Sequence, residues 1–233
     1  MKNYILFFTA FILSVQMTAH AEIKADYIFT GSLTGNIAEA PDIEFLGSPV
    51  NFEMGLINGF SVDAIEIELG SGLRLDLSQW NLCDEFTIVL HGYLDDIFGY
   101  KKLIDFREGL GDAGLYNNAG KLEYVVGQTA LNTSLVDGIY FQLVMTRAPS
   151  GEVKVYLDRE LQLEFMDDAN GTSLCFSNNL YFFKDDTSTG IENPSGGIAR
   201  ITIYDTELSA DEVGELEILD IIFFSDFELI QQP

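Results

Sequence analysis

The part of the chain that most constrains its fold is residues 180–213, LYFFKDDTSTGIENPSGGIARITIYDTELSADEV. Leu180 to Lys184 is aromatic and apolar, as a strand is, and two aspartates then end it. Polar and apolar side chains alternate from Ile198 to Tyr204, which predicts a half-buried strand. Ser209 followed three residues later by Glu212 predicts a helix that starts with a capping box. The order is therefore strand, acidic loop, strand and short helix.

Short runs of this kind recur along the chain, and Gly, Pro, Asn and Asp separate them about every 8–12 residues. That spacing is typical of a β-sandwich and not of a helical protein. The runs that predict strands are Asp26–Thr30, Val50–Met54, Ile65–Leu69, Leu73–Leu77, Phe86–Leu94, Tyr100–Phe106, Ile139–Thr146, Glu152–Asp158 and Glu160–Phe165.

Three features of these runs carry specific expectations. Gly70-Ser71-Gly72 joins two alternating runs, which predicts a hairpin. Phe86–Leu94 is more continuously apolar than the others and is expected to be a central strand. Simple alternation along Tyr100–Phe106 would place Leu103 and Asp105 on the face opposite Lys102, Ile104 and Phe106.

The chain resembles the laminin G-like (concanavalin A-like) jelly-roll domains of secreted bacterial proteins. The segment GGIARITIYDTELSADEV is similar to the last strand of that family and the turn after it. KKLIDFREGLGDAGLY, YFQLVMTRAPSGEVKVYLDRE and LYFFKDD are similar to family strands in the family order. The resemblance, from about Asp26 to Leu219, implies an all-β, two-sheet antiparallel β-sandwich in which the Asp26–Thr30 strand pairs with the last strand. It says little about function, because the fold carries sugar binders, adhesion modules and glycosidases.

The first 21 residues are typical of a secretory signal peptide. Lys2 is followed by an apolar run from Tyr4 to Val15 and by Ala19-His20-Ala21, which predicts cleavage after Ala21. The alternative is a short membrane anchor, which the brevity of the apolar run disfavours. We therefore expect a signal peptide at 1–21, one sandwich domain at 22–219 and a C-terminal tail at 220–233, in a secreted, periplasmic or cell-surface protein. The apolar run of the tail is too short to span a bilayer.

The formal charge of -25, from 37 acidic and 12 basic residues, excludes most nucleic-acid and anionic-lipid binders. Most of these carboxylates are expected to keep the surface solvated. The chain has two cysteines, Cys83 and Cys175. Export to an oxidising compartment predicts a disulfide between them, with buried free thiols as the alternative.

Calcium is the metal that the sequence favours, as a possible cofactor. Asp185, Asp186 and Glu192 bracket a loop rich in Ser, Thr and Gly, and together they offer hard oxygen ligands. In relatives of the laminin G-like and pentraxin-like type, a calcium ion at a loop rim takes part in ligand binding, and the resemblance implies the same here. The alternative is a polar turn in which the aspartates accept hydrogen bonds from nearby backbone N–H groups. Asp112, Asp167 and Asp168 are weaker candidates.

Catalytic motifs are absent from the sequence. There is no G-x-S-x-G, H-E-x-x-H or P-loop, and His91 is more simply a structural residue of a central strand. Glu66 and Glu68 alternate as in laminarinase-type glycosidases, but Gly70 stands where their third acid would be.

The function expected from the sequence is that of a non-enzymatic module that binds glycans or glycan-bearing surfaces. A glycoside hydrolase or lyase, or a protein-binding adhesion module, is the alternative. Exposed aromatics that stack on sugar rings would carry the binding. The candidates are Trp80, Tyr93, Tyr116 and Tyr124.

Overall fold

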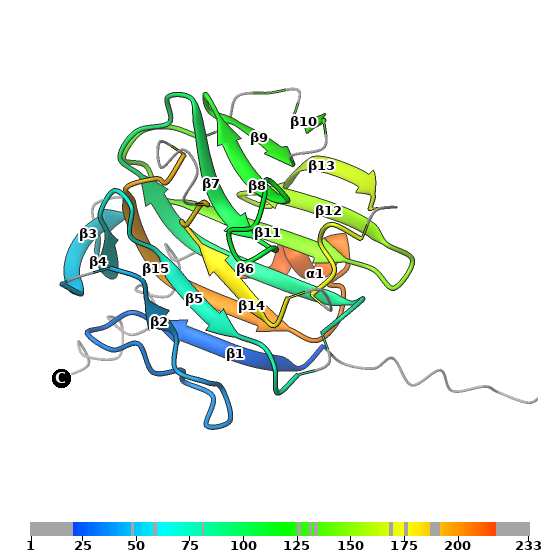
Figure 1. Ribbon diagram of the computed structural model, residues 1–233, viewed down its shortest axis with the longest axis horizontal. Coiled ribbons are helices and arrows are strands. Elements are labelled where there is room, and N and C mark those ends of the chain that lie inside the picture. The colour runs from blue at the N-terminus through cyan, green and yellow to red at the C-terminus, as the bar shows by residue number, and fades with distance from the viewer. Residues whose placement is uncertain are drawn as a thin grey trace, which may run out of the picture.

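The computed structural model describes residues 21–217, apart from 48, 58–59, 81, 125–126, 131, 133–134, 168–169, 175–176 and 187–191. The described residues form two antiparallel sheets, with the seven-stranded sheet in front in Figure 1. The larger sheet has the order β13 (Glu160–Met166), β12 (Glu152–Leu157), β11 (Phe141–Arg147), β6 (Phe86–Leu94), β15 (Gly196–Tyr204), β4 (Phe60–Ile67) and β3 (Asn51–Ile57), and β1 (Ile23–Ile28) also pairs with β15. The smaller sheet has the order β10 (Gln128–Thr129), β9 (Lys121–Tyr124), β8 (Gly114–Asn118), β7 (Tyr100–Asp105), β14 (Asn179–Phe182), β5 (Leu73–Asp76) and β2 (Glu44–Phe45). The expected all-β, two-sheet antiparallel sandwich is confirmed.

The hydrophobic core lies between the two sheets and is filled by alternate residues of their strands. Ile201 and Ile203 of β15 and Leu90 of β6 face Leu180 and Phe182 of β14 in one buried cluster. Removing this much apolar surface from water is the main source of the stability of such a sandwich.

The pairing of the first strand with the last one is confirmed. In β1, Asp26 pairs with Thr202 and Tyr27 with Ile201 of β15. β4 pairs with the other half of the same edge of β15, at residues 196–198, while β6 runs along its opposite edge. β6 is central, as its continuous apolar sequence predicts, and the meander of β11, β12 and β13 is adjacent in the sheet. The meander turn at Asp158 and Arg159 has positive φ at both residues, +49° and +71°, which is the type I′ geometry that hairpins favour.

The predicted hairpin around Gly70-Ser71-Gly72 is wrong. β4 lies in the larger sheet and β5 in the smaller one, so this turn carries the chain across the sandwich. Gly70, with φ of +86°, allows the sharp change of direction. Each strand presents an apolar face to the same core. Two such strands can bury these faces either side by side in one sheet or opposite each other in two sheets, so the alternation alone does not distinguish the two arrangements.

The predicted capping box is confirmed at the start of α1 (Ala210–Glu215). The Ser209 side chain accepts from the Glu212 backbone N–H, and the Glu212 carboxylate accepts from the Ser209 N–H at 2.8 Å. Val213 of α1 packs with Val89, Val144 and Tyr156 on the outer face of the larger sheet, which α1 therefore covers in part. α1 is too short and polar to cross a membrane, and no other helix of the described residues could. Residues 1–20 of the predicted signal peptide (1–21) and the whole predicted tail (220–233) lie outside the described residues.

Candidate functional site on the outer face of the seven-stranded sheet

The outer face of the seven-stranded sheet carries a row of polar and aromatic side chains. The alternation that turns Leu115 and Leu122 into the core turns Tyr116 and Glu123 outward. In the pairing register, Tyr116 of β8 lies between Lys102 of β7 and Glu123 of β9. This face is therefore where the fold places side chains that could meet a ligand.

The simple alternation predicted for β7 is wrong, because the strand has a bulge. The pairing register shifts between Lys102 and Ile104, and Leu103 and Ile104 are both fully buried in the core. A bulge re-aims the side chains beside it. Lys102 is thereby placed in a buried polar network on the outer side of the sheet.

Lys102 is completely buried, and its ammonium is the centre of this network. Its Nζ lies 2.8 Å from a carboxylate oxygen of Asp105 and 2.8 Å from one of Asp185, and it donates to the Gly111 carbonyl at 3.0 Å. Burial alone would lower the pKa of Lys102, but the charges and hydrogen bonds of Asp105 and Asp185 outweigh it and the pKa is raised. The same Nζ lies 4.9 Å from the ring centre of Tyr116, whose hydroxyl donates to Asp185 at 3.3 Å. One buried cation thus ties β7 and β8 to two loops.

The loop 107–113 is held in place by hydrogen bonds that Asp105 and Glu108 accept. Asp105 accepts from the backbone N–H of Arg107 at 2.9 Å and of Gly109 at 3.0 Å. Glu108 has a φ of +58°, and its carboxylate accepts from Ser177 at 2.8 Å and Asn179 at 2.7 Å. Those two hydrogen bonds, that of Asn179 first, lower the pKa of Glu108. The loop is therefore a preformed wall over the sheet.

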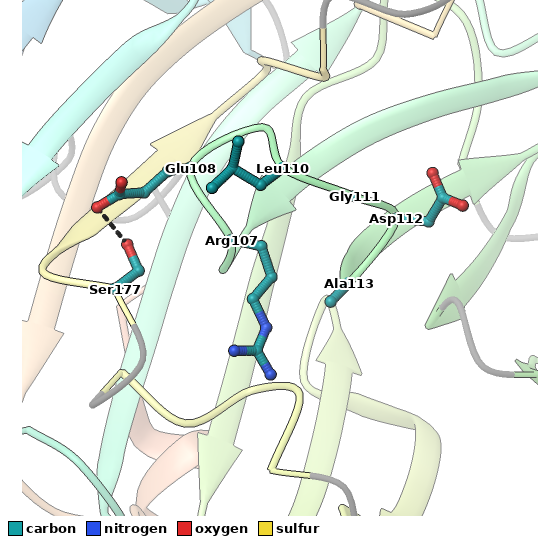
Figure 2. A pocket seen from close by; sticks show the side chains of 7 residues that line it. All are labelled: Arg107, Glu108, Leu110, Gly111, Asp112, Ala113 and Ser177. Carbon is teal, nitrogen blue, oxygen red and sulfur yellow. Dashed lines mark hydrogen bonds between the residues drawn. The ribbon is translucent and has the colours of Figure 1, made fainter.

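A pocket of about 380 Å³ lies along this loop and is closed on one side by Ser177 (Figure 2). Its volume falls in the range of roughly 300–1,000 Å³ that small-molecule sites occupy. Figure 2 shows the Glu108 carboxylate turned toward Ser177 and the Asp112 carboxylate pointing to the opposite side of the loop. Leu110, which is 85% exposed, gives the pocket an apolar edge.

A second pocket, of about 190 Å³, shares Asp112 with the first. Tyr100, Tyr116, Glu123 and Glu192 complete its lining. We call it the tyrosine pocket. Tyr100 is 41% exposed, and its ring packs edge-to-face with Tyr116 at 6.0 Å between centres. Asp112 is the wall that the two pockets have in common.

Carboxylates set the electrostatic character of the tyrosine pocket. Burial, and then the neighbouring carboxylates of Asp185 and Asp112, raise the pKa of Glu192. The pKa of Tyr100 is also raised, first by the Glu123 charge, to which its hydroxyl donates at 3.4 Å. Both shifts have a nearby negative charge among their causes.

The three residues of the predicted calcium site lie at different depths. Asp185 is buried beneath the tyrosine pocket and bonded to Lys102, so an ion there would compete with an ammonium. Glu192 lines the pocket, and residues 187–191 between them lie outside the described part of the chain. Within the described ranges no group of three or more His, Cys, Asp or Glu residues is arranged to hold a metal. The site at Asp185, Asp186 and Glu192 stays a prediction.

The aromatic candidates differ in exposure. Tyr124 is 1% exposed and stacks on Phe165 in the core, so it offers no ring to a sugar. Trp80 packs partly buried against the core, and the Tyr93 hydroxyl is hydrogen-bonded to Glu53. Tyr116 lines the tyrosine pocket but is 1% exposed.

Tyr100, the exposed ring of the pocket, was not among the candidates predicted from the sequence. Its position at the first residue of a strand was the available signal, because strand ends meet the loops.

Cys83 is one of the two cysteines for which the sequence predicts a disulfide. Ser173, two residues before Cys175, donates to the Cys83 carbonyl at 2.9 Å, so the chain near Cys175 passes beside Cys83. Cys175 itself lies outside the described residues, and its pairing with Cys83 stays a prediction.

No protein-family model matches the chain, and no curated protein matches its sequence. Solved structures do share its fold. Domain 4 of AbnA, an extracellular GH43 arabinanase of Geobacillus stearothermophilus in complex with arabinotriose, is 14% identical with a TM-score of 0.61, over 84% of this chain and 98% of that one. The binding domain of botulinum neurotoxin serotype D is 14% identical with a TM-score of 0.57, and the match covers 82% of this chain and 50% of that one. The CBM40 of a Ruminococcus gnavus IT-sialidase, bound to α2,3 sialyllactose, is 16% identical with a TM-score of 0.52, over 66% of this chain and 96% of that one. At these identities the likeness establishes the β-sandwich fold that this chain shares with carbohydrate-binding and lectin-like domains, while the narrower laminin G-like assignment stays a prediction.

Proposed function

We propose that this chain is a secreted, non-enzymatic glycan-binding module whose ligand lies on the outer face of the seven-stranded sheet. The observation that carries the proposal is the tyrosine pocket. It combines a half-exposed ring, Tyr100, with the carboxylates of Asp112, Glu123 and Glu192, and it adjoins a larger pocket. An aromatic ring stacks on the apolar face of a sugar, and carboxylates accept hydrogen bonds from its hydroxyls.

Preorganisation supports the same proposal. Lys102 and Asp105 hold the loop 107–113 through the Gly111 carbonyl and two backbone N–H groups. Groups that are fixed before the ligand arrives lose little conformational entropy on binding. Structures of similar fold bind arabinotriose and sialyllactose, which agrees with a glycan as the ligand class here.

A glycan array probed with the purified protein, once with calcium and once with a chelator, tests the proposal. For the best glycan, Tyr100→Ala is expected to raise Kd by about two- to tenfold, because one stacking contact contributes about 0.5–1.5 kcal/mol. The matched control is Glu160→Gln, an exposed residue on the edge strand β13 of the other sheet. An array without hits, or hits that Tyr100→Ala leaves unchanged, would contradict the proposal. Loss of binding in the chelator would support calcium as part of the site.

Glycoside hydrolysis is the second candidate, because three carboxylates line one pocket. The raised pKa of Glu192 suits a general acid, and Asp112 would then be the partner carboxylate. The test is release of reducing ends from the glycans that bind. Hydrolysis that Glu192→Gln abolishes, with binding retained, would favour the enzyme over the binding module.

A further inference from the structure

The tyrosine pocket is lined by acidic and neutral residues. Its five lining residues are Tyr100, Asp112, Tyr116, Glu123 and Glu192, so none of them is basic. The ammonium beneath it, that of Lys102, is fully buried and lies between two further carboxylates, those of Asp105 and Asp185. The pocket therefore presents a negative potential to whatever enters it.

The tyrosine rings suit a cation as well as a sugar. The Lys102 ammonium lies 4.9 Å from the ring centre of Tyr116, so one ring of the pair already interacts with a positive charge. Tyr100 packs edge-to-face against that ring and leaves 41% of its surface exposed. A positive group of a ligand could contact the exposed Tyr100 ring as Lys102 contacts that of Tyr116.

The close spacing of the carboxylates also favours a positively charged ligand. Glu192 is partly buried close to Asp185 and Asp112, and the Tyr100 hydroxyl lies 3.4 Å from Glu123. Like charges held together in a partly dehydrated site repel one another, and an incoming positive charge relieves the repulsion. An incoming carboxylate or sulfate would add to it.

We propose that the tyrosine pocket selects glycans that carry a protonated amine, such as 2-amino-2-deoxy sugars, over their N-acetylated counterparts and over uronic, sialic or sulfated glycans. This inference rests on the proposed glycan-binding function and deepens it by naming the ligand class. The sugar ring stacks on Tyr100, and the ammonium lies between Asp112, Glu123 and Glu192.

Calorimetric titration with two trisaccharides tests the selectivity. The glucosamine trimer and the N-acetylglucosamine trimer have the same rings and linkage, and they differ in the acetylation that converts each protonated amine into a neutral amide. The glucosamine trimer is expected to bind about five- to tenfold more tightly at low salt, since partly exposed ion pairs contribute up to about 1 kcal/mol each. The difference should shrink at high salt, where charges are screened.

Pocket variants separate selectivity from general attraction to an acidic protein. Asp112→Asn is expected to weaken the glucosamine trimer by about threefold more than it weakens the N-acetylated trimer, which has no ammonium for the carboxylate to pair with. Tyr100→Ala should weaken both trimers, and the control Glu160→Gln neither. Trilysine, which has amines but no sugar ring, reports non-specific attraction, and Tyr100→Ala should weaken its binding less than that of the glucosamine trimer.

The outcomes distinguish the amine selectivity from the glycan-binding function on which it rests. Tighter binding of the N-acetylated trimer, equal binding of the two, or a preference for a uronate-bearing glycan would overturn the amine selectivity and leave the glycan module standing. Binding of the glucosamine trimer that Asp112→Asn does not change would also overturn it. Absence of any glycan ligand would refute both proposals.

Discussion

The buried ammonium of Lys102 is the strongest test of how the site is built. Lys102→Met removes the positive charge that lies between Asp105 and Asp185, 2.8 Å from a carboxylate oxygen of each, and leaves two buried carboxylates without that partner. Breaking a buried pair from one side costs about 3–5 kcal/mol. For a chain of this size each kcal/mol lowers Tm by about 2–4 °C, so the expected loss is about 6–20 °C.

Urea unfolding and calorimetry would measure the loss. The triple variant Lys102→Met with Asp105→Asn and Asp185→Asn removes all three charges and should recover part of the stability, because no carboxylate is then left unpaired. A loss below about 1 kcal/mol, or a triple variant less stable than the single one, would refute the assignment of Lys102 as the organising charge.

Four further outcomes are expected. Burial lowers the pKa of His91 to about 4, so the folded protein loses stability as the pH falls from 6.5 toward 4. Relative to the His91→Gln variant, the loss should reach about 2 kcal/mol at about pH 5. Unfolding free energies of the two proteins that change in parallel with pH would contradict this. Ser209→Ala removes the helix cap and should cost about 1 kcal/mol by urea unfolding, whereas Ser209→Asp should cost far less. Cys83→Ser should cost about 2–4 kcal/mol with the predicted Cys175 disulfide, and mass spectrometry that finds a free thiol in the native protein would rule the disulfide out. Calcium in large excess over Kd should raise Tm if the predicted site binds it, and Asp186→Ala should abolish the rise. An unchanged Tm of the parent protein would show that the predicted site does not bind calcium.

The fold was largely predictable because its signals are local. Period-two alternation marked β4, β5 and β15, a continuous apolar run marked β6, turn residues separated β11, β12 and β13, and a four-residue motif marked the start of α1. The pairing of β1 with β15 came from the resemblance to a family, not from the alternation itself. Alternation tells which face of a strand is buried but not which strand lies beside it.

The site was less predictable than the fold. Asp185 and Glu192 were identified as site residues from the sequence, yet Asp185 proved to be the partner of a buried lysine far away in the chain. Tyr100, Asp112 and Glu123 belong to different elements, and no spacing in the sequence relates them.

The amino-acid sequence by itself determined most of the strands, the buried faces of those that alternate regularly, and the helix cap, since these depend on side chains a few residues apart. Only the tertiary structure decided that β4 and β5 separate into different sheets, that a bulge places Lys102 beneath the loops, and that three carboxylates meet two tyrosines. The physical reason is that such contacts join residues distant in the chain, and they form only when the sheets twist and pack around a common core.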